Sequence, residues 1–277
     1  MDERDFRRPG CMIYLRYAFV AIVLLITTLI LAPLQMLCLW RRWKLARKLP
    51  RYWHIVACFV LGIRVHMRGR IEPRRPLMLS ANHTSWLDII VLGRVADVAF
   101  IAKSEVKSWP VFGLFARLQN SVFIERGDRR GTGKQIGTIA ARLTGGEIII
   151  LFPEGTTSDG NRLWPLKYSL FGAASSAVSE VPEGKVYVQP VAVAYTGIQG
   201  MPMGRFQRPI VAWPGDVEML PSLAAVIRAR ALDVDVCFGE SVVFDATTKR
   251  KVAAIEIEDR MRRLLAERLR GRPGLPD

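Results

Sequence analysis

His83 and Asp88 stand five residues apart where an apolar stretch gives way to a helical pattern, in PLMLSANHTSWLDII. If Thr84 or Ser85 caps that helix, Asp88 falls in its first turn and can face the loop that carries His83. A carboxylate on one imidazole nitrogen fixes the tautomer and supports the imidazolium, which leaves the other nitrogen as a general base. The alternative is structural, because Ser85 and Asp88 also fit a capping box in which the carboxylate serves the helix N-terminus.

A second polar loop follows the apolar segment 121–125, in SVFIERGDRR. It places the guanidinium of Arg126 at the mouth of a predicted strand, and arginine suits bidentate recognition of phosphate or carboxylate. An ion pair of Arg126 with Glu125 or Asp128 is the alternative that the spacing leaves open. Arg126 is therefore a candidate ligand-binding residue whose partner the spacing does not decide.

The third polar loop, in EIIILFPEGTTSDGNR, follows the apolar segment 148–152. Pro153 and Gly155 set a defined turn around Glu154, and the backbone amides and hydroxyls that follow can cradle an anion. Glu154 is expected either to hold this turn or to contact a substrate. An ordinary turn without a ligand is the alternative to a binding site.

Strand-like and helical segments alternate from residue 71 onward. Short apolar, often β-branched runs predict strands at 77–80, 98–102, 121–125, 148–152, 186–195 and 234–238. Helical spacing of apolar residues predicts helices at 86–94, 106–118, 133–143 and 168–178, and an amphipathic helix near the C-terminus. This alternation predicts an α/β fold with a mostly parallel sheet flanked by helices, in which the three polar loops share the carboxyl edge where ligands collect. The run 148–152 has no polar alternation and is expected to be a central strand.

Four blocks of this chain, taken in order, resemble the PlsC-like glycerolipid acyltransferases. The blocks of that family read NHxxxxD, FIxR, FPEG(T)xS and a final apolar VxPV. The matching segments here are 82–88, 123–126, 152–158 and 188–191. One block alone would be a weak signal, whereas four in family order over residues 77–195 are a specific one.

The resemblance implies a glycerolipid-acyltransferase-like fold and a direct acyl transfer. His83, oriented by Asp88, would deprotonate the hydroxyl of a lysolipid, which then attacks an acyl thioester without an acyl-enzyme, metal or other cofactor. The expected thioester donor is acyl carrier protein or coenzyme A. By family analogy, the residues expected to bind substrate are Asn82, Lys103, Arg126, Glu154, Gly155 and Thr156.

One departure from the family pattern bears on the acceptor. In lysophosphatidate enzymes the third block usually continues as FPEGTR, but position 157 here is Thr157. The first expectation is still 1-acyl-glycerol-3-phosphate, which would give phosphatidic acid. The alternative is lyso-ornithine lipid, because EGTTSDGNR and the later KYSLFGAA resemble a bacterial branch that acylates it.

The charge of the chain is unevenly distributed. Its 277 residues carry a formal net charge of +15, of which +11 lies within residues 1–75. Nucleic-acid binding would explain the net charge of +15 but not why that charge clusters beside an apolar span. A serine esterase is not supported, because the sequence has no GxSxG motif. A non-catalytic, membrane-docked lipid-binding module stays as an alternative from another class. The four scattered cysteines have no metal-ligand spacing, so neither a metal site nor a disulfide framework is expected.

The segment 17–40 has no charged residue and is long enough to cross a bilayer. A cleaved signal peptide is disfavoured because the run is too long and lacks a cleavage site, and a core helix would be unusually apolar on all faces. The expectation is an anchor, either spanning or broken at Pro33 into a re-entrant or interfacial pair.

A basic, aromatic stretch follows that anchor. The segment 41–51 holds six basic residues and no acid, and tryptophans beside cations are typical of the headgroup zone. Residues 1–70 are therefore predicted as a membrane anchor with an interfacial segment at 41–66, residues 71–270 as the catalytic domain, and 271–277 as a loose tail. The positive-inside rule places the catalytic domain on the cytoplasmic face of a bacterial inner membrane. His54 is expected at the interface and His66 in a basic strand, so neither is a catalytic candidate.

Overall fold

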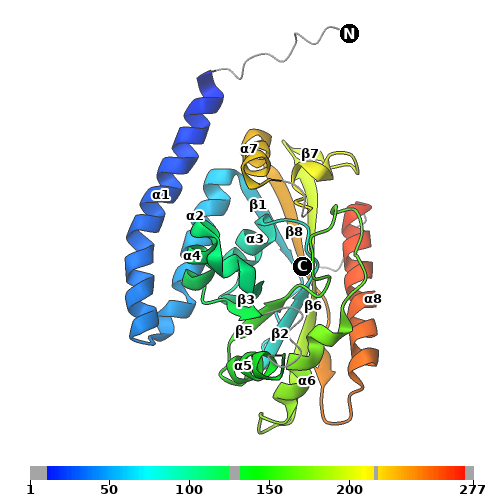
Figure 1. Cartoon of the computed structure of the whole chain (residues 1–277). Helices are drawn as coiled ribbons and strands as arrows, with labels where there is room; N and C mark the ends of the chain where they lie inside the picture. The colour runs from blue at the N-terminus through cyan, green and yellow to red at the C-terminus, as the bar shows by residue number, and fades with distance from the viewer. Residues whose placement is uncertain (1–10, 125–131, 215–217, 272–277) are drawn as a thin grey trace.

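A mixed sheet runs through the middle of the molecule, with helices on both of its faces (Figure 1). The computed structural model describes residues 11–124, 132–214 and 218–271. Within these residues the sheet has nine strands, and seven of them follow the order β1-β8-β6-β2-β5-β3-β4, while β7 and β9 pair with β6. The strands are β1 (Ile63–Arg68), β2 (Leu77–Ala81), β3 (Val98–Lys103), β4 (Val122–Ile124), β5 (Ile148–Leu151), β6 (Val186–Ile198), β7 (Met201–Pro202), β8 (Leu232–Phe238) and β9 (Val242–Phe244).

The pairing confirms the predicted mixed, mostly parallel sheet. Strands β6, β2, β5, β3 and β4 run parallel to one another, and β8 is antiparallel to β6. Strand β1 pairs in parallel with β8, so the sheet begins at Ile63, before the boundary at residue 70 that the sequence suggested. The last residues of the predicted segment 41–66 therefore belong to the edge strand β1.

Side chains of the central strands point alternately into two apolar cores. On β5, Ile150 packs into one core and Ile149 into the other, and both are fully buried. This confirms the expectation that the unbroken apolar run is a central strand covered on both faces. The first core is closed by α1 (Cys11–Trp40), α2 (Leu49–Leu61), α3 (Leu87–Val95) and α7 (Met219–Ala229), and the second by α5 (Thr132–Thr144), α6 (Gly172–Val178) and α8 (Arg250–Leu269). The remaining helices are α4 (Pro110–Leu118) and the short 3-10 turns η2 (Lys44–Arg47), η3 (Ser104–Ser108), η4 (Tyr168–Phe171) and η5 (Arg208–Ile210).

Helix α1 lies along the flank of the domain rather than projecting from it (Figure 1). Near its start, Arg16 donates Nε to the carbonyl of Ile227 at 2.8 Å. Near its end, the buried Gln35 donates Nε2 to the carbonyls of Ala46 and Leu118, at 2.9 and 2.7 Å. The helix is 30 residues long and apolar enough to cross a membrane, yet polar contacts fix both halves of it to the domain.

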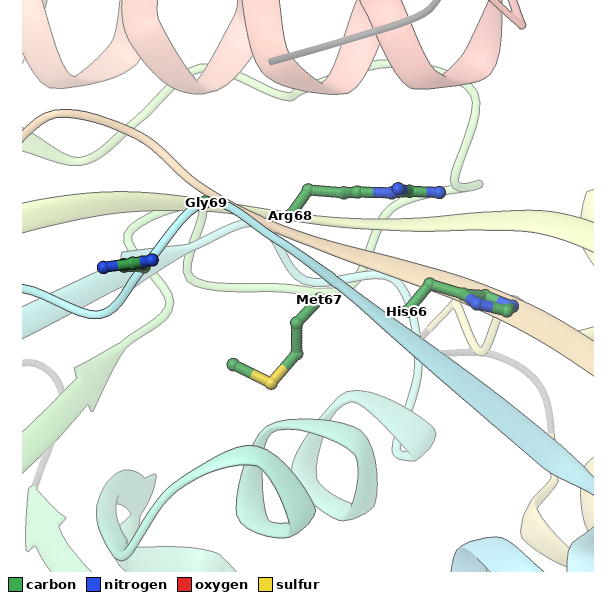
Figure 2. A pocket seen from close by; sticks show the side chains of 5 residues that line it. His66, Met67, Arg68 and Gly69 are labelled. Carbon is green, nitrogen blue, oxygen red and sulfur yellow. The ribbon is translucent and has the colours of Figure 1, made fainter. Parts of the chain in front are cut away.

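The two histidines outside the candidate site have structural partners. His54 is buried in α2, with Nε2 2.8 Å from Oε1 of Gln119, so the expectation of an interfacial position was wrong. His66 lies on the edge strand β1, as the sequence indicated, with Nε2 3.0 Å from Oδ1 of Asp233. It lines a shallow hollow formed only by residues 66–70, in which Met67 points away from Arg68 across the strand (Figure 2).

Candidate active site

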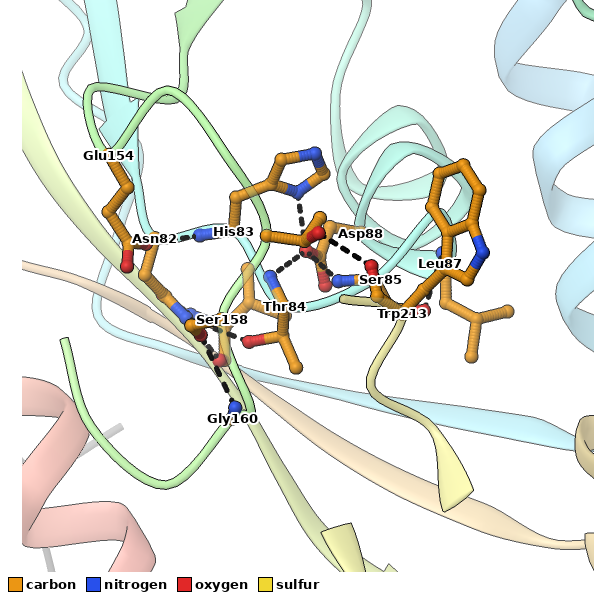
Figure 3. Close-up of polar contacts among 12 residues, drawn as sticks. Asn82, His83, Thr84, Ser85, Leu87, Asp88, Glu154, Ser158, Gly160 and Trp213 are labelled. Atoms are coloured by element: carbon orange, nitrogen blue, oxygen red, sulfur yellow. Dashed lines mark hydrogen bonds and ion pairs between the residues drawn. The ribbon is translucent and has the colours of Figure 1, made fainter. Parts of the chain in front are cut away.

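His83 lies just beyond the carboxyl end of β2, in the loop that leads into α3 (Figure 3). Its Nδ1 is 2.9 Å from Oδ2 of Asp88, which sits in the first turn of α3. The side chain of Asp88 is 0% exposed, whereas that of His83 is 20% exposed. Figure 3 shows the second ring nitrogen, Nε2, pointing away from Asp88. A buried carboxylate thus orients an imidazole whose other nitrogen is available to a substrate.

Asp88 makes both of the contacts that its spacing from His83 suggested. Besides facing His83, Oδ2 of Asp88 accepts hydrogen bonds from the backbone N–H groups of Thr84 and Ser85, at 2.6 and 2.9 Å. These bonds satisfy donors of the loop that enters α3, as a helix-capping carboxylate does. Capping fixes the carboxylate, and the fixed carboxylate fixes the histidine ring.

Tyr195 is a residue of this site that the sequence reasoning missed. It lies on β6, fully within the apolar core, and donates its hydroxyl to Oδ1 of Asp88 at 2.7 Å. Burial, followed by the charge of Asp88, raises the pKa of Tyr195 well above 10, so the phenol keeps its proton and remains a donor. The sole signal in the sequence was a hydroxyl within the apolar run VAVAY, 107 residues away from Asp88.

The third polar loop holds the backbone of His83 from both sides. Oε1 of Glu154 accepts from the N–H of His83 at 2.7 Å, and the N–H of Ser158 donates to the carbonyl of His83 at 2.8 Å. Oε2 of Glu154 accepts from the N–H of Trp164 at 2.8 Å. The carboxylate of Glu154 therefore joins two loops through backbone groups, which is the turn-holding alternative left open by the sequence.

The environment of Glu154 favours its protonated form. Burial is the main cause that raises its pKa to about 7, the two backbone hydrogen bonds oppose that shift, and the charge of Asp88 adds to it. Beside it, Gly155 has φ +75°, a left-handed conformation that other residues adopt at a cost. The turn thus requires glycine next to the buried carboxyl.

The ring of His83 stacks on the ring of Phe152, which directly follows β5. The ring centroids are 4.0 Å apart and the planes differ by 16°. Phe152 in turn lies parallel to Phe100 of β3, with centroids 6.2 Å apart. The imidazole is therefore held at Nδ1 by Asp88 and on one face by Phe152, so its orientation is set before substrate arrives.

The first and third polar loops meet at Trp213, in the segment after η5. The carbonyl of Trp213 accepts from the hydroxyl of Thr157 at 2.5 Å, and its N–H donates to the carbonyl of Thr84 at 2.9 Å. Thr157 is buried, so the position that departs from the lysophosphatidate pattern serves the loop. It supplies no positive charge to a ligand.

The structure brings together some of the predicted site residues. Asn82 accepts from the N–H of Val193 through Oδ1 at 2.7 Å and donates Nδ2 to the Val193 carbonyl at 3.0 Å, which ties the histidine loop to β6. Thr156 is exposed, next to Gly155. Lys103 is exposed at the end of β3, two strands from β2 on the same edge of the sheet, or about 10 Å along it. Arg126 lies outside the described residues.

Comparison with known proteins gives concordant results. The family model described as Acyltransferase matches residues 62–194. A lyso-ornithine lipid O-acyltransferase of Rhizobium meliloti is 58% identical over 259 residues, covering 94% of this chain and 89% of that protein. A 1-acyl-sn-glycerol-3-phosphate acyltransferase of Neisseria meningitidis serogroup B is 33% identical, covering 77% of this chain and 78% of that protein.

A solved structure shares the fold. The crystal structure of PlsC, a 1-acyl-sn-glycerophosphate acyltransferase from Thermotoga maritima, aligns with a TM-score of 0.64 at 24% identity. The alignment covers 95% of this chain and 97% of that one. It includes the N-terminal part as well as the sheet, so the architecture described above is common to both proteins.

Proposed function

The chain belongs to the acyltransferase family, and from that premise we propose that it moves an acyl group from a thioester to the hydroxyl of lyso-ornithine lipid. The observation that carries the reaction type is the pair at the carboxyl edge of the sheet. Nδ1 of His83 is 2.9 Å from a fully buried carboxylate, and its Nε2 is the nitrogen left to act. A general base oriented in this way can activate an alcohol without forming a covalent enzyme intermediate.

The proposed reaction has one proton path. Nε2 of His83 takes the proton of the acceptor hydroxyl while that oxygen attacks the thioester carbonyl carbon. As the carbon–sulfur bond breaks, the departing thiolate takes the proton back from the imidazolium. Asp88 orients the ring and stabilises the imidazolium through Nδ1. The products are an ester and a free thiol, and His83 is returned to its starting state.

We assign the predicted site residues to two roles. Asn82 and Glu154 use their side chains on backbone groups and therefore position the histidine loop. Thr156, Lys103 and Arg126 are proposed to contact the substrates. Thr156 is exposed beside Gly155, and Lys103 is the last residue of β3. Arg126 follows β4 by two positions in the sequence, and β4 is parallel to β3. The donor is proposed to be acyl carrier protein or acyl-coenzyme A.

Two observations favour lyso-ornithine lipid over 1-acylglycerol-3-phosphate as the main acceptor. The relative that is 58% identical carries that name, whereas the one named for the glycerophosphate acceptor is 33% identical. At position 157, where lysophosphatidate enzymes usually have arginine, the buried Thr157 gives its hydroxyl to Trp213. An ornithine head group carries a carboxylate and an ammonium group but no phosphate, so it has less need of that cation.

An acceptor panel tests this proposal. Purified full-length chain is given lyso-ornithine lipid or 1-acylglycerol-3-phosphate, each with acyl carrier protein and coenzyme A thioesters, and kcat/KM is measured. We expect at least about tenfold preference for lyso-ornithine lipid, since one charged hydrogen bond is worth about 1.5–3 kcal/mol. A preference for the glycerophosphate would overturn the acceptor assignment, and no transfer to either lipid would overturn the function.

We further infer that α1 lies in one leaflet of the bacterial inner membrane, with the domain on the cytoplasmic face. Its outward side is lined with exposed apolar residues such as Phe19, Leu25 and Leu29, which suits a lipid environment. Its inner side is fixed to the domain through Arg16 and Gln35, near opposite ends of the helix. A helix attached along most of its length cannot cross the bilayer unless the domain enters it.

Cys11 offers a direct test of this position. It is exposed at the start of α1, whereas Cys38, Cys58 and Cys237 are buried. A membrane-impermeant maleimide is expected to label Cys11 in inverted vesicles, from the side that carries the domain, and not in right-side-out vesicles. The variant Cys11→Ser gives the background. Labelling in right-side-out vesicles alone would show that α1 crosses the membrane.

A further inference from the structure

A basic cavity lies at the amino edge of the parallel strands, opposite the edge that carries His83. It has a volume of about 290 Å³ and opens where β3 and β5 begin. The basic residues that line it come from three separate parts of the chain. They are Lys44, Arg47, Lys48, Arg75 and Arg142. The fold thus gathers cations here that are up to 98 positions apart in sequence.

The carboxylates of this cavity are already neutralised. Two line it, Asp97 and Glu147. Glu147 is 2.5 Å from Nη2 of Arg142 and 3.4 Å from Nη2 of Arg47. Asp97 is 3.8 Å from Nη1 of Arg51, which lies outside the cavity. The lining therefore has three cations in excess, before Arg51 is counted.

The excess cations are free to meet an anion. Lys44 and Lys48 are exposed, and no carboxylate of residues 11–124, 132–214 or 218–271 pairs with either. Arg75 donates Nη1 to the backbone carbonyls of Glu72 and Arg74, at 2.6 and 2.9 Å. Lysines supply mobile point charges and a guanidinium supplies a planar fork, a combination that suits phosphate.

The cavity borders the end of the membrane helix. Lys44 and Arg47 belong to η2, which follows α1 after three residues, at the lower end of α1 in Figure 1. Trp40 is 73% exposed and Trp43 48% exposed beside it. Exposed tryptophans next to cations are typical of the headgroup level of a bilayer, where basic pockets bind lipid phosphates.

From these observations we propose that the cavity binds the phosphodiester head group of an anionic phospholipid. The proposal rests on the membrane position of α1 given above and assigns a second lipid contact to the domain, apart from the acyl-transfer site. One lipid bound here, together with α1, fixes the rotation of the domain about the helix. The edge that carries His83 then keeps a constant orientation toward the membrane.

The test compares two charge-matched double variants of the full chain in neutral detergent. Lys44→Gln with Lys48→Gln removes two cations from the cavity. Lys249→Gln with Lys251→Gln removes two exposed lysines at the start of α8, on the opposite side of the sheet from α1 (Figure 1). Binding of monomeric dihexanoyl phosphatidylglycerol is measured by calorimetry, with dihexanoyl phosphatidylcholine and inorganic phosphate as the other probes.

We expect one saturable phosphatidylglycerol site per chain. The cavity variant should weaken it by roughly 10- to 30-fold, since each cation near the headgroup contributes about 1 kcal/mol. The α8 variant should stay within about twofold of wild type, and phosphatidylcholine should not saturate. Equal losses in both variants, or saturable phosphatidylcholine binding, would overturn the proposal.

The remaining arms separate this proposal from neighbouring ones. Inorganic phosphate that binds as tightly as phosphatidylglycerol would mark a site for a soluble anion and would overturn the lipid assignment. Transfer to a short-chain lysolipid in detergent should be unchanged in the cavity variant, because the cavity is at the far edge of the sheet from His83. Loss of phosphatidylglycerol binding with retained transfer supports the second site, whereas absent transfer in wild type is a failure of the proposed function alone.

Discussion

The two edges of the same parallel strands carry polar groups of opposite character. At the carboxyl edge Asp88 is fully buried and both of its oxygens have donors, while His83 exposes a single working nitrogen. At the amino edge Lys44 and Lys48 are exposed, on flexible side chains. Chemistry at the first edge depends on the direction of individual hydrogen bonds, and binding at the second depends on summed charge. Substitutions at the two edges should therefore differ widely in size and in what they change.

The largest effect is expected at His83. His83→Ala removes the general base and should lower kcat by about 10²- to 10⁴-fold, and Asp88→Asn should approach that loss by releasing the ring. Phosphatidylglycerol binding at the amino edge should be unaffected in both. The measurement is transfer of radiolabelled acyl groups to lysolipid, with membrane sedimentation as the control. Activity of His83→Ala within tenfold of wild type would contradict the mechanism.

The next effect concerns the pH dependence of stability at Glu154. Its pKa of about 7 in the fold lies above its ordinary value of 4.5, so the folded chain holds a proton that the unfolded chain releases between these pH values. The stabilisation from this group is present below pH 4.5 and is lost as the pH rises through 7. Relative to Glu154→Gln, the unfolding free energy of wild type should fall by up to about 3 kcal/mol over this range.

Denaturant titrations in detergent at several pH values measure that difference. Glu154→Gln lacks the titrating proton, so its own curve should be flatter between pH 4.5 and 7. Parallel curves for the two proteins would show that Glu154 keeps an ordinary pKa.

A smaller effect is expected at Tyr195. Tyr195→Phe leaves the ring in place but removes the donor to Oδ1 of Asp88, which should lower kcat about tenfold with little change in KM. Tyr168→Phe is the matched control, because it deletes a hydroxyl that donates to Glu258, at α8.

The smallest effect on turnover is expected from the amino edge. The Lys44→Gln and Lys48→Gln double variant should change kcat on soluble lysolipid by less than about twofold, although it weakens lipid binding. A tenfold fall in kcat would show that the two edges are coupled and do not act independently. Initial rates with a short-chain acceptor in detergent decide between these outcomes.

The local sequence pattern was enough to predict that His83 and Asp88 lie close together. Parallel strands bring the loops after β2 and β5 to one edge, and the five-residue spacing of His83 and Asp88 across a helix start leaves few conformations. The polar residues that follow these strands are therefore expected at the carboxyl edge of the sheet. The spacing alone could not show whether Asp88 contacts His83 or caps the helix, because one carboxylate contacts both the ring of His83 and the backbone N–H of Thr84.

Contacts between residues far apart in the chain could not be predicted from the sequence. The apolar helix was predicted from residue 17, whereas α1 spans Cys11–Trp40 and includes Arg16, whose guanidinium donates to the Ile227 carbonyl of α7. The sequence around Arg16 does not indicate this partner, which is 211 positions away. Likewise Tyr195 reads as one more core residue until β6 is placed beside β2. The same holds for the strand β1, which lies before the predicted boundary at residue 70 and is part of the sheet only through its pairing with β8.

The two hydrogen bonds between the side chain of Asn82 and the backbone of Val193 bear on when the enzyme becomes active during synthesis. These residues are 111 positions apart, and the further contact of Thr84 with Trp213 lies later still in the chain. Helix α1, in contrast, packs on α2, which is made directly after it. During synthesis from the N-terminus, the chain can dock on a membrane well before its histidine loop has anything to hold it. A ribosome-bound or truncated chain that ends before Val193 would therefore be attached to the membrane but inactive.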